Sequence, residues 1–164
     1  MGVQADIIKA AELIMSQTPF VNTVIANHGA QGPTVNDLPK DRTPTLDEMR
    51  KFILDTPMED FNATFMVNTT SVFYTFAAFM PLLDAGNKHP DSPGKTNGID
   101  SQFILTSSIG SMSKKPGMGY AYAASKAGAN LMAKQLSTNM APYHIRCNVF
   151  APGIYPSDMS TVSP

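Results

Sequence analysis

Three short runs of β-branched and other apolar residues, separated by long helical patterns, limit most strongly what this chain can fold into. They cover residues 20–27, 102–107 and 145–151. Runs of this length, bounded by turn-forming residues, predict buried strands. When helices connect successive strands, the strands form a parallel sheet with right-handed crossovers. We therefore predict an α/β fold in which the three strands lie side by side in chain order.

Two long helical patterns supply the crossovers. The first is predicted over residues 57–84, where apolar side chains recur at helical spacing and Pro81 should bend the last turn. The second covers residues 120–140. A further helix is predicted over residues 5–17 and ends before Pro19.

Two patterns mark helix starts between the first strand and the first long helix. In each, a threonine is followed three residues later by a glutamate, so each side chain can bond to the other's backbone amide. The pairs are Thr45 with Glu48 and Thr56 with Glu59, and Pro57 strengthens the second because proline favours the first helical position. Segments rich in small, polar, glycine or proline residues predict loops at 30–44, 86–100 and 107–119.

The predicted sheet is small for its class, because doubly wound sheets usually have five or more strands. The 164 residues are therefore interpreted as a single incomplete domain that spans residues 1–164. Unpaired backbone groups at a sheet edge invite pairing, and the apolar surface of two long helices favours association with a further copy. We expect a homo-oligomer.

Charge and cysteine content exclude several classes of protein. Twelve Lys and Arg against thirteen Asp and Glu give a net charge of -1, without the basic excess that nucleic-acid binding requires. The richest apolar stretch, residues 73–83, is shorter than the roughly 18 residues that span a bilayer, so no membrane span is expected. Cys147 is the sole cysteine and the first residues do not resemble a signal peptide, so we expect a cytoplasmic protein.

A phenol and an amine lie four residues apart in the second long helix. Tyr122 and Lys126 therefore share one helical face. A lysine cation beside a phenol stabilises the phenolate, which suits the phenol to exchange a proton with an alcohol or carbonyl oxygen. The alternative is an ordinary helical pair, because this spacing also arises by chance.

A pair of serines follows the second strand. In open α/β sheets, ligands bind beyond the carboxyl ends of the strands, and the chain has to return from Ser108 to the helix that carries Tyr122. The two side chains could then face one crevice, where Ser108 would hydrogen-bond a carbonyl oxygen. The alternative is a serine that closes a strand-to-loop turn.

Two other chemistries find no support. The three histidines, His28, His89 and His144, show no ligand spacing with each other or with Cys147, so no metal site is expected. The Gly-x-Ser-x-Gly turn of serine hydrolases does not occur in the sequence.

Taken in order, the motifs resemble those of the short-chain dehydrogenase/reductase family. The resemblance covers about residues 5 to 160 and rests on Val24 to Gly29, Val67-Asn68-Thr, Ile104 to Ser108, Tyr122 with Lys126, and Asn148 to Gly153. It implies a partial doubly wound, Rossmann-like parallel sheet with crossover helices. It also implies an oxidoreductase that transfers a hydride between a nicotinamide cofactor and an alcohol or carbonyl substrate.

The resemblance implies catalytic roles for four residues. Tyr122 would be the general acid or base, and Lys126 would lower its pKa and hold the nicotinamide ribose. Ser108 would orient and polarise the substrate oxygen. Asn68 would support a water relay to Lys126.

The resemblance also implies contacts with the cofactor, NADP or NAD. Asn27 and Gly29 would border it at the end of the first strand. Four residues after the third strand would lie against the nicotinamide: Pro152, Gly153, Ile154 and Ser157. The family more often has threonine at the position of Ser157.

The sequence departs from the family's pattern at both ends. It has no counterpart of the first strand and of the glycine-rich turn that holds the pyrophosphate, and none of the C-terminal strand. The interval from Ser108 to Tyr122 is also slightly longer than usual. The substrate and the choice of NAD or NADP stay open. Two functions remain: an oxidoreductase that acts within a longer chain or assembly, or a non-catalytic fragment that acts through its interaction surfaces.

Overall fold

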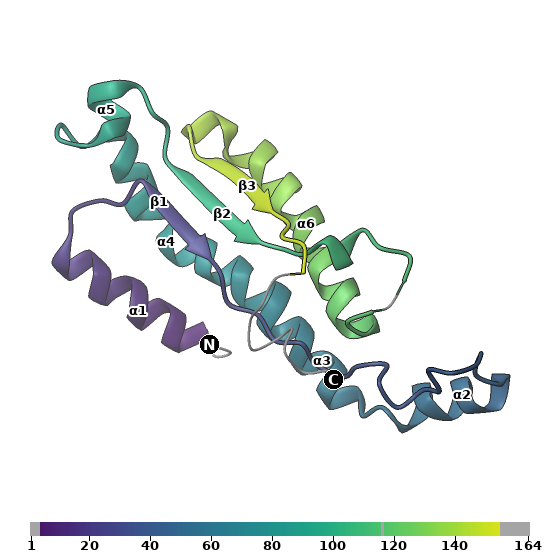
Figure 1. Cartoon of the computed structure of the whole chain (residues 1–164). Coiled ribbons are helices and arrows are strands. Elements are labelled where there is room, and N and C mark those ends of the chain that lie inside the picture. Colours follow the sequence, from purple (N-terminus) through teal and green to yellow (C-terminus); the bar gives the residue numbers. More distant parts are fainter. Residues whose placement is uncertain (1–3, 116, 155–164) are drawn as a thin grey trace.

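The computed structural model describes residues 4–115 and 117–154. Its three strands form one parallel sheet in the order β1-β2-β3, as predicted (Figure 1). The strands are β1 (Thr23–Ala26), β2 (Gln102–Thr106) and β3 (Arg146–Phe150). The α-helices are α1 (Gln4–Gln17), α2 (Leu46–Asp55), α3 (Met58–Phe65), α4 (Ser71–Lys88), α5 (Pro93–Asn97) and α6 (Tyr120–Met140). Short segments complete the order: the π-helix η1 (Met66–Thr70) and the 3-10 turns η2 (Ile109–Ser111) and η3 (Ala141–Tyr143).

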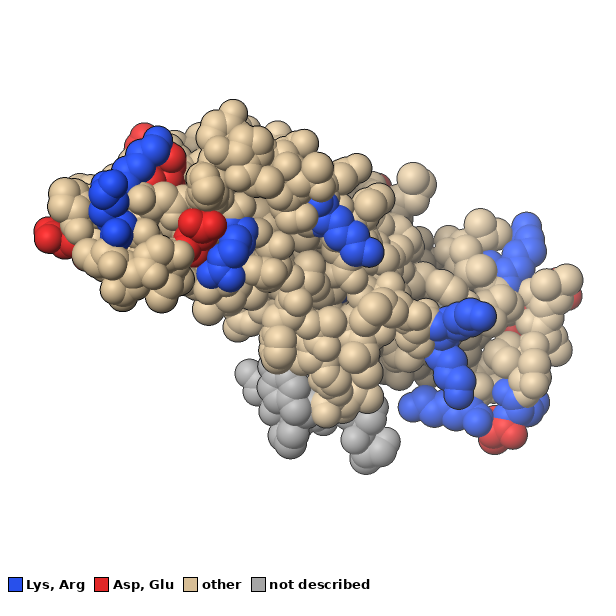
Figure 2. Space-filling model, turned by 90° about the horizontal axis from the view of Figure 1, so that it is seen from above, with Lys and Arg blue, Asp and Glu red and all other residues tan. Residues whose placement is uncertain are grey.

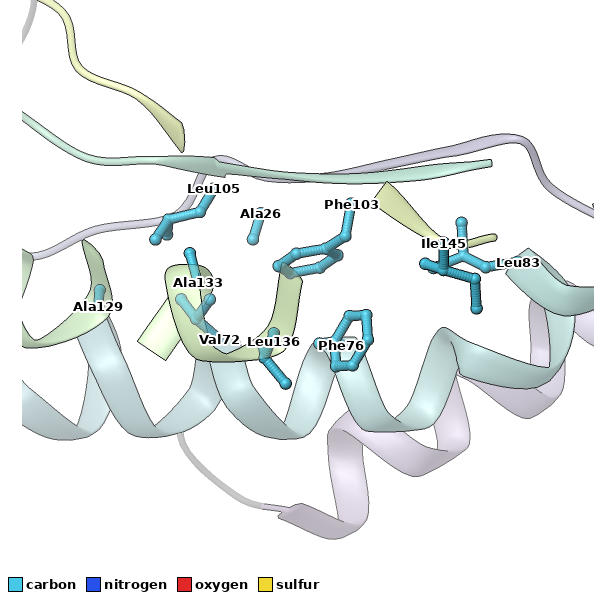
Figure 3. Packing of buried hydrophobic residues seen from close by; sticks show 10 residues of the cluster. All are labelled: Ala26, Val72, Phe76, Leu83, Phe103, Leu105, Ala129, Ala133, Leu136 and Ile145. Atoms are coloured by element: carbon cyan, nitrogen blue, oxygen red, sulfur yellow. The ribbon is translucent and has the colours of Figure 1, made fainter. Parts of the chain in front are cut away.

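The core lies between one face of the sheet and the helices α4 and α6 (Figure 3). Alternate residues of β2, Phe103 and Leu105, point into it and are almost fully buried, as the two-residue period of a strand requires. Phe103 meets Phe76 of α4 edge to face, with ring centroids 5.1 Å apart. The predicted crossover helices therefore cover the same face of the sheet.

The opposite face of the sheet is open within the described part of the chain. Ile25 of β1 and Phe150 of β3 point to this side and are 59% and 62% exposed. An apolar sheet face without a covering layer is unusual in an α/β domain, where helices normally cover both faces. Within the described residues, helices thus cover one face of the sheet and leave the other face exposed.

One of the two predicted capping boxes forms. The hydroxyl of Thr45 accepts from the amide of Glu48, and the Glu48 carboxylate accepts from the amide of Thr45. The prediction for Thr56 is wrong, because this residue is the C-cap of α2 and its hydroxyl donates to the carbonyl of Phe52. Pro57 is the N-cap of α3 and provides no side-chain cap.

The first long helix runs further than predicted. It extends from Met58 through η1 to Lys88, past the expected end at Asp84, and Pro81 lies exposed within it. The polar connection that follows is not a continuous loop, because Ser92 caps the short helix α5 and Gly98 closes it in the left-handed conformation. The local sequence therefore placed the end of the long helix, and with it the start of the polar connection, too early.

This long helix also meets a length-and-composition criterion for crossing a bilayer, contrary to the sequence expectation. In the fold, 39% of its most apolar 18-residue window is buried inside the domain. The core helix of a soluble protein meets the same criterion, so the absence of a membrane span stays a prediction.

Two helical glycines provide a test of this packing. A Cβ at Gly86 of α4 would lie 2.4 Å from the carbonyl oxygen of Val21, whereas one at Gly128 of α6 would meet nothing closer than 3.8 Å. We expect Gly86→Ala to lower the free energy of unfolding by about 1–3 kcal/mol through overpacking. Gly128→Ala should leave it unchanged or raise it by up to about 1 kcal/mol, since alanine favours a helix. Chemical denaturation measures both, and equal effects would contradict the packing described here.

Candidate active site

Tyr122 and Lys126 lie one turn apart near the start of α6, and both are buried, with 7% and 3% exposed. The helix begins after Gly119, whose φ of 95° is in the left-handed region. A Cβ at Gly119 would lie 2.1 Å from the carbonyl oxygen of Pro33. The loop that follows β1 is therefore packed directly against the start of the helix that carries the phenol and the amine.

The amine of Lys126 reaches the carboxyl end of the sheet. Its Nζ donates to the carbonyl oxygen of Thr106, the last residue of β2, at 2.8 Å. Burial lowers the pKa of Lys126 to about 8, because the charged form loses hydration. Gly29 lies beside it: a Cβ there would be 3.3 Å from this Nζ and 3.4 Å from Oδ1 of Asn68.

Ser108 follows β2 and faces Tyr122 across Gly110. Its hydroxyl oxygen accepts from the amide of Gly110 at 3.0 Å, and the hydroxyl proton finds no acceptor among residues 4–115 and 117–154. A Cβ at Gly110 would lie 3.3 Å from Oγ of Ser108 and 3.7 Å from the ring of Tyr122. The absence of a side chain at Gly110 therefore lets the two predicted catalytic side chains approach each other.

Asn68 joins the end of β1 to α6. It is fully buried in the π-helical segment η1, where its Oδ1 accepts from the amide of Ala30 at 2.8 Å. Its Nδ2 donates to the carbonyl of Ala30 at 2.8 Å and to Oγ of Ser125 at 3.0 Å. Ser125 in turn donates to the carbonyl of Tyr122 at 2.8 Å. Asn68 thus positions the strand end against the turn of α6 that holds Tyr122 and Lys126.

Asn130 was not predicted as a site residue, although it continues the same helical face four residues beyond Lys126. Its Nδ2 donates to Oγ of Ser111 at 2.7 Å, and that hydroxyl donates to the carbonyl of Ser108 at 2.6 Å. These bonds fasten the Ser108 loop to α6. The four-residue spacing from Tyr122 through Lys126 to Asn130 was the signal that could have found it.

The predicted cofactor contacts lie at the carboxyl ends of the outer strands. Asn27 is exposed directly after β1. After β3, the carbonyl of Pro152 accepts from the amide of Ile109 at 3.0 Å, which brings this segment beside the Ser108 loop. Gly153 and Ile154 are exposed, and Ser157 lies outside the described residues. Among the described residues, no group of three or more His, Cys, Asp or Glu side chains could hold a metal ion.

An apolar cavity of about 250 Å³ lies beside this group, not within it. Its lining includes Phe52 of α2, Phe61 of α3 and Tyr120 of α6, whereas Ser108, Tyr122 and Lys126 do not line it. The polar cluster at the carboxyl end of the sheet, and not this cavity, therefore brings together the predicted chemistry.

Comparisons with known proteins show which family this chain matches. The family model for short chain dehydrogenases matches residues 2–163. Short-chain dehydrogenase/reductase SAT3 of Stachybotrys chartarum is 42% identical over 97% of this chain and 61% of its own length. PhomF of Diaporthe leptostromiformis is 40% identical over 94% of this chain and 50% of its own length. The chain therefore spans about half to three-fifths of these curated relatives.

Solved structures share the fold. NADPH-bound carbonyl reductase from chicken fatty liver matches with a TM-score of 0.74 at 20% identity, over 99% of this chain and 59% of that one. The NADP active-site complex of RhlG from Pseudomonas aeruginosa matches with a TM-score of 0.73 at 21% identity, over 96% and 52%. At these identities the structural likeness shows the arrangement of strands and helices.

The burial of Lys126 predicts a pH dependence of stability. Since its pKa in the fold, about 8, is below the ordinary 10.5, the unfolded chain binds more protons between these values, and stability rises with pH across this window. Denaturation of the wild type and Lys126→Met from pH 7 to 11 should show the wild type gaining stability relative to the variant. Lys134→Met, at an exposed position on the same helix, should stay parallel to the wild type. Parallel curves for Lys126→Met would show that its amine is not desolvated.

Proposed function

The chain belongs to the short-chain dehydrogenase family, and from this premise we propose that it provides the reacting groups of an NAD(P)-dependent oxidoreductase. The reaction is hydride transfer between nicotinamide and an alcohol or carbonyl substrate. The observation that carries the proposal is the grouping of Ser108, Tyr122 and Lys126 at the carboxyl end of the sheet, with Gly110 between the serine hydroxyl and the phenol ring.

Each of these side chains has a chemical task in the proposed reaction. Ser108 donates its hydroxyl proton to the substrate oxygen and so orients and polarises it. Tyr122 gives its phenolic proton to that oxygen during reduction and takes it back during oxidation. The cation of Lys126, one helical turn away, stabilises the phenolate that remains. Asn68 keeps the end of β1 against the turn of α6 that holds both groups.

The residues present fit the nicotinamide and ribose end of such a cofactor. Gly29 leaves space beside Lys126 and Asn68 that a Cβ would fill. A bound nicotinamide supplies or accepts the hydride. Lys126 would hold the ribose, with Asn27 and Gly29 on one side and the segment from Pro152 to Ile154 on the other. The described residues contain no glycine-rich turn between a strand and a helix that could bind the pyrophosphate.

A second candidate function is a non-catalytic one, in which the chain acts through its surfaces alone. The open sheet face with Ile25 and Phe150 favours it, because such a face needs a covering partner. The two candidates differ in what Tyr122 does: it is required for turnover in the first and dispensable in the second.

We also propose that the protein forms homo-oligomers and acts in the cytoplasm without nucleic-acid or membrane partners. Phe73 and Tyr74 of α4 and Leu131 of α6 are exposed apolar side chains on the two long helices, which supports self-association. Figure 2 shows one face of the molecule, where most charged side chains lie towards the two ends, several Lys and Arg side chains lie together at one of them, and uncharged residues cover most of the middle.

Replacing Tyr122 by phenylalanine tests the proposed chemistry. In a form of the enzyme that reduces carbonyl compounds with NADH or NADPH, Tyr122→Phe should lower kcat by about 10²–10⁴-fold, the usual contribution of a general acid. Binding of the cofactor should be unchanged, as judged by nicotinamide fluorescence. The matched control is Tyr120→Phe, two residues earlier at an exposed position of the same helix. Near-normal turnover in Tyr122→Phe would exclude this role and favour the non-catalytic candidate.

The 164-residue chain alone should not bind NAD(H) or NADP(H) measurably below millimolar concentration. Because the described residues offer no glycine-rich turn to the pyrophosphate, the cofactor loses several charge-assisted hydrogen bonds worth roughly 1.5–3 kcal/mol each. Titration calorimetry on the purified chain measures this directly. A micromolar dissociation constant would show that the chain completes the cofactor site by itself.

A further inference from the structure

The π-helical segment η1 shifts the backbone hydrogen bond of Ser71 by one residue. The amide of Ser71 bonds to the carbonyl of Met66, five residues earlier, instead of that of Val67. In an α-helix the carbonyl of Val67 would receive this amide. Here Oγ of Ser71 donates to the Val67 carbonyl at 2.8 Å.

His28 completes this arrangement from the end of β1. Its Nε2 lies 2.7 Å from Oγ of Ser71. A serine hydroxyl has one proton, and in this arrangement that proton is given to Val67, so Nε2 of His28 must carry a hydrogen and donate it. Burial and the nearby charge of Lys126 lower the pKa of His28, which favours the neutral ring. The neutral ring then has its hydrogen on Nε2.

The segment stabilised in this way carries Asn68. Three hydrogen bonds in two contacts fasten the loop after β1 to it: one between His28 and Ser71, and two between Asn68 and the backbone groups of Ala30. The two contacts lie two residues apart in the loop and three residues apart in the helix. The helical register sets the angle between Asn68 and Ser71 about the helix axis, so a change of register would move one contact relative to the other.

We propose that His28 is a positioning residue, whose hydrogen bond to Ser71 stabilises the π-helical register that directs Asn68 at Ala30 and at Ser125. Because Ser125 bonds to the carbonyl of Tyr122, this register sets how the end of β1 meets the turn of α6 with Tyr122 and Lys126. The structural part of this inference is independent of catalysis. Its effect on turnover rests on the proposed function.

The chain offers a matched set of variants. His28→Phe removes the donor, Ser71→Ala removes the acceptor, and His28→Gln restores an amide donor near the position of Nε2. The control is Thr75→Val, one turn further along α4. Thr75 makes the same bond to a carbonyl four residues earlier, at 2.8 Å to Ser71, but has no histidine partner.

Nitrogen-15 NMR of the 164-residue chain tests the structural part without cofactor. The wild-type spectrum should show neutral His28 with its hydrogen on Nε2. In His28→Phe and Ser71→Ala, the side-chain amide protons of Asn68 should exchange about tenfold faster, the factor that corresponds to one ordinary hydrogen bond. Thr75→Val and His28→Gln should exchange like the wild type. A hydrogen on Nδ1, or equal exchange in all variants, would overturn the inference.

Kinetics of an active form of the enzyme test the consequence. His28→Phe should lower kcat several-fold with KM for the cofactor unchanged, and His28→Gln should recover it, because misplacement of reacting groups affects the chemical step. If Tyr122 proves dispensable, the proposed function fails while the NMR result stands. If the NMR result fails, the role of His28 is wrong whatever Tyr122 does.

Discussion

The clamp of Asn68 on Ala30 is the interaction on which the arrangement of the site depends. One buried amide bonds to both backbone groups of a single residue, and so fixes the direction as well as the position of the chain leaving β1. The same amide reaches Ser125 of α6. Since unpaired polar groups are costly inside a protein, these bonds hold three distant segments together: the end of β1, the long helix and α6.

Close backbone approach is the second requirement of the site, and glycines provide it. Gly29 lies against Lys126 and Asn68, Gly110 lies beside both Ser108 and the ring of Tyr122, and Gly119 lies against Pro33. At each position a side chain would occupy space that the site needs for another group. The polar cluster at the carboxyl end of the sheet therefore depends on missing side chains as much as on the chemical groups themselves.

The two faces of the sheet differ in how far the described residues cover them. The face towards α4 and α6 carries a packed core. From α6, in the same layer, the amine of Lys126 reaches the carboxyl end of β2. The other face exposes Ile25 and Phe150 within the described residues. The chain spans about half to three-fifths of its curated relatives, and the groups proposed for proton transfer all belong to the covered layer.

The sequence by itself determined the three strands, their parallel order, the span of α6, the capping box at Thr45, and the shared face of Tyr122 and Lys126. These features follow from periodicity and spacing within a few residues, which local chemistry specifies. Tertiary structure decided the rest. Thr56 joined the end of α2 instead of the start of α3, and the long helix continued past Asp84 to Lys88. The contacts of His28 with Ser71 and of Asn68 with Ala30 join residues 43 and 38 positions apart, and no local pattern specifies them, because only folding brings such residues together.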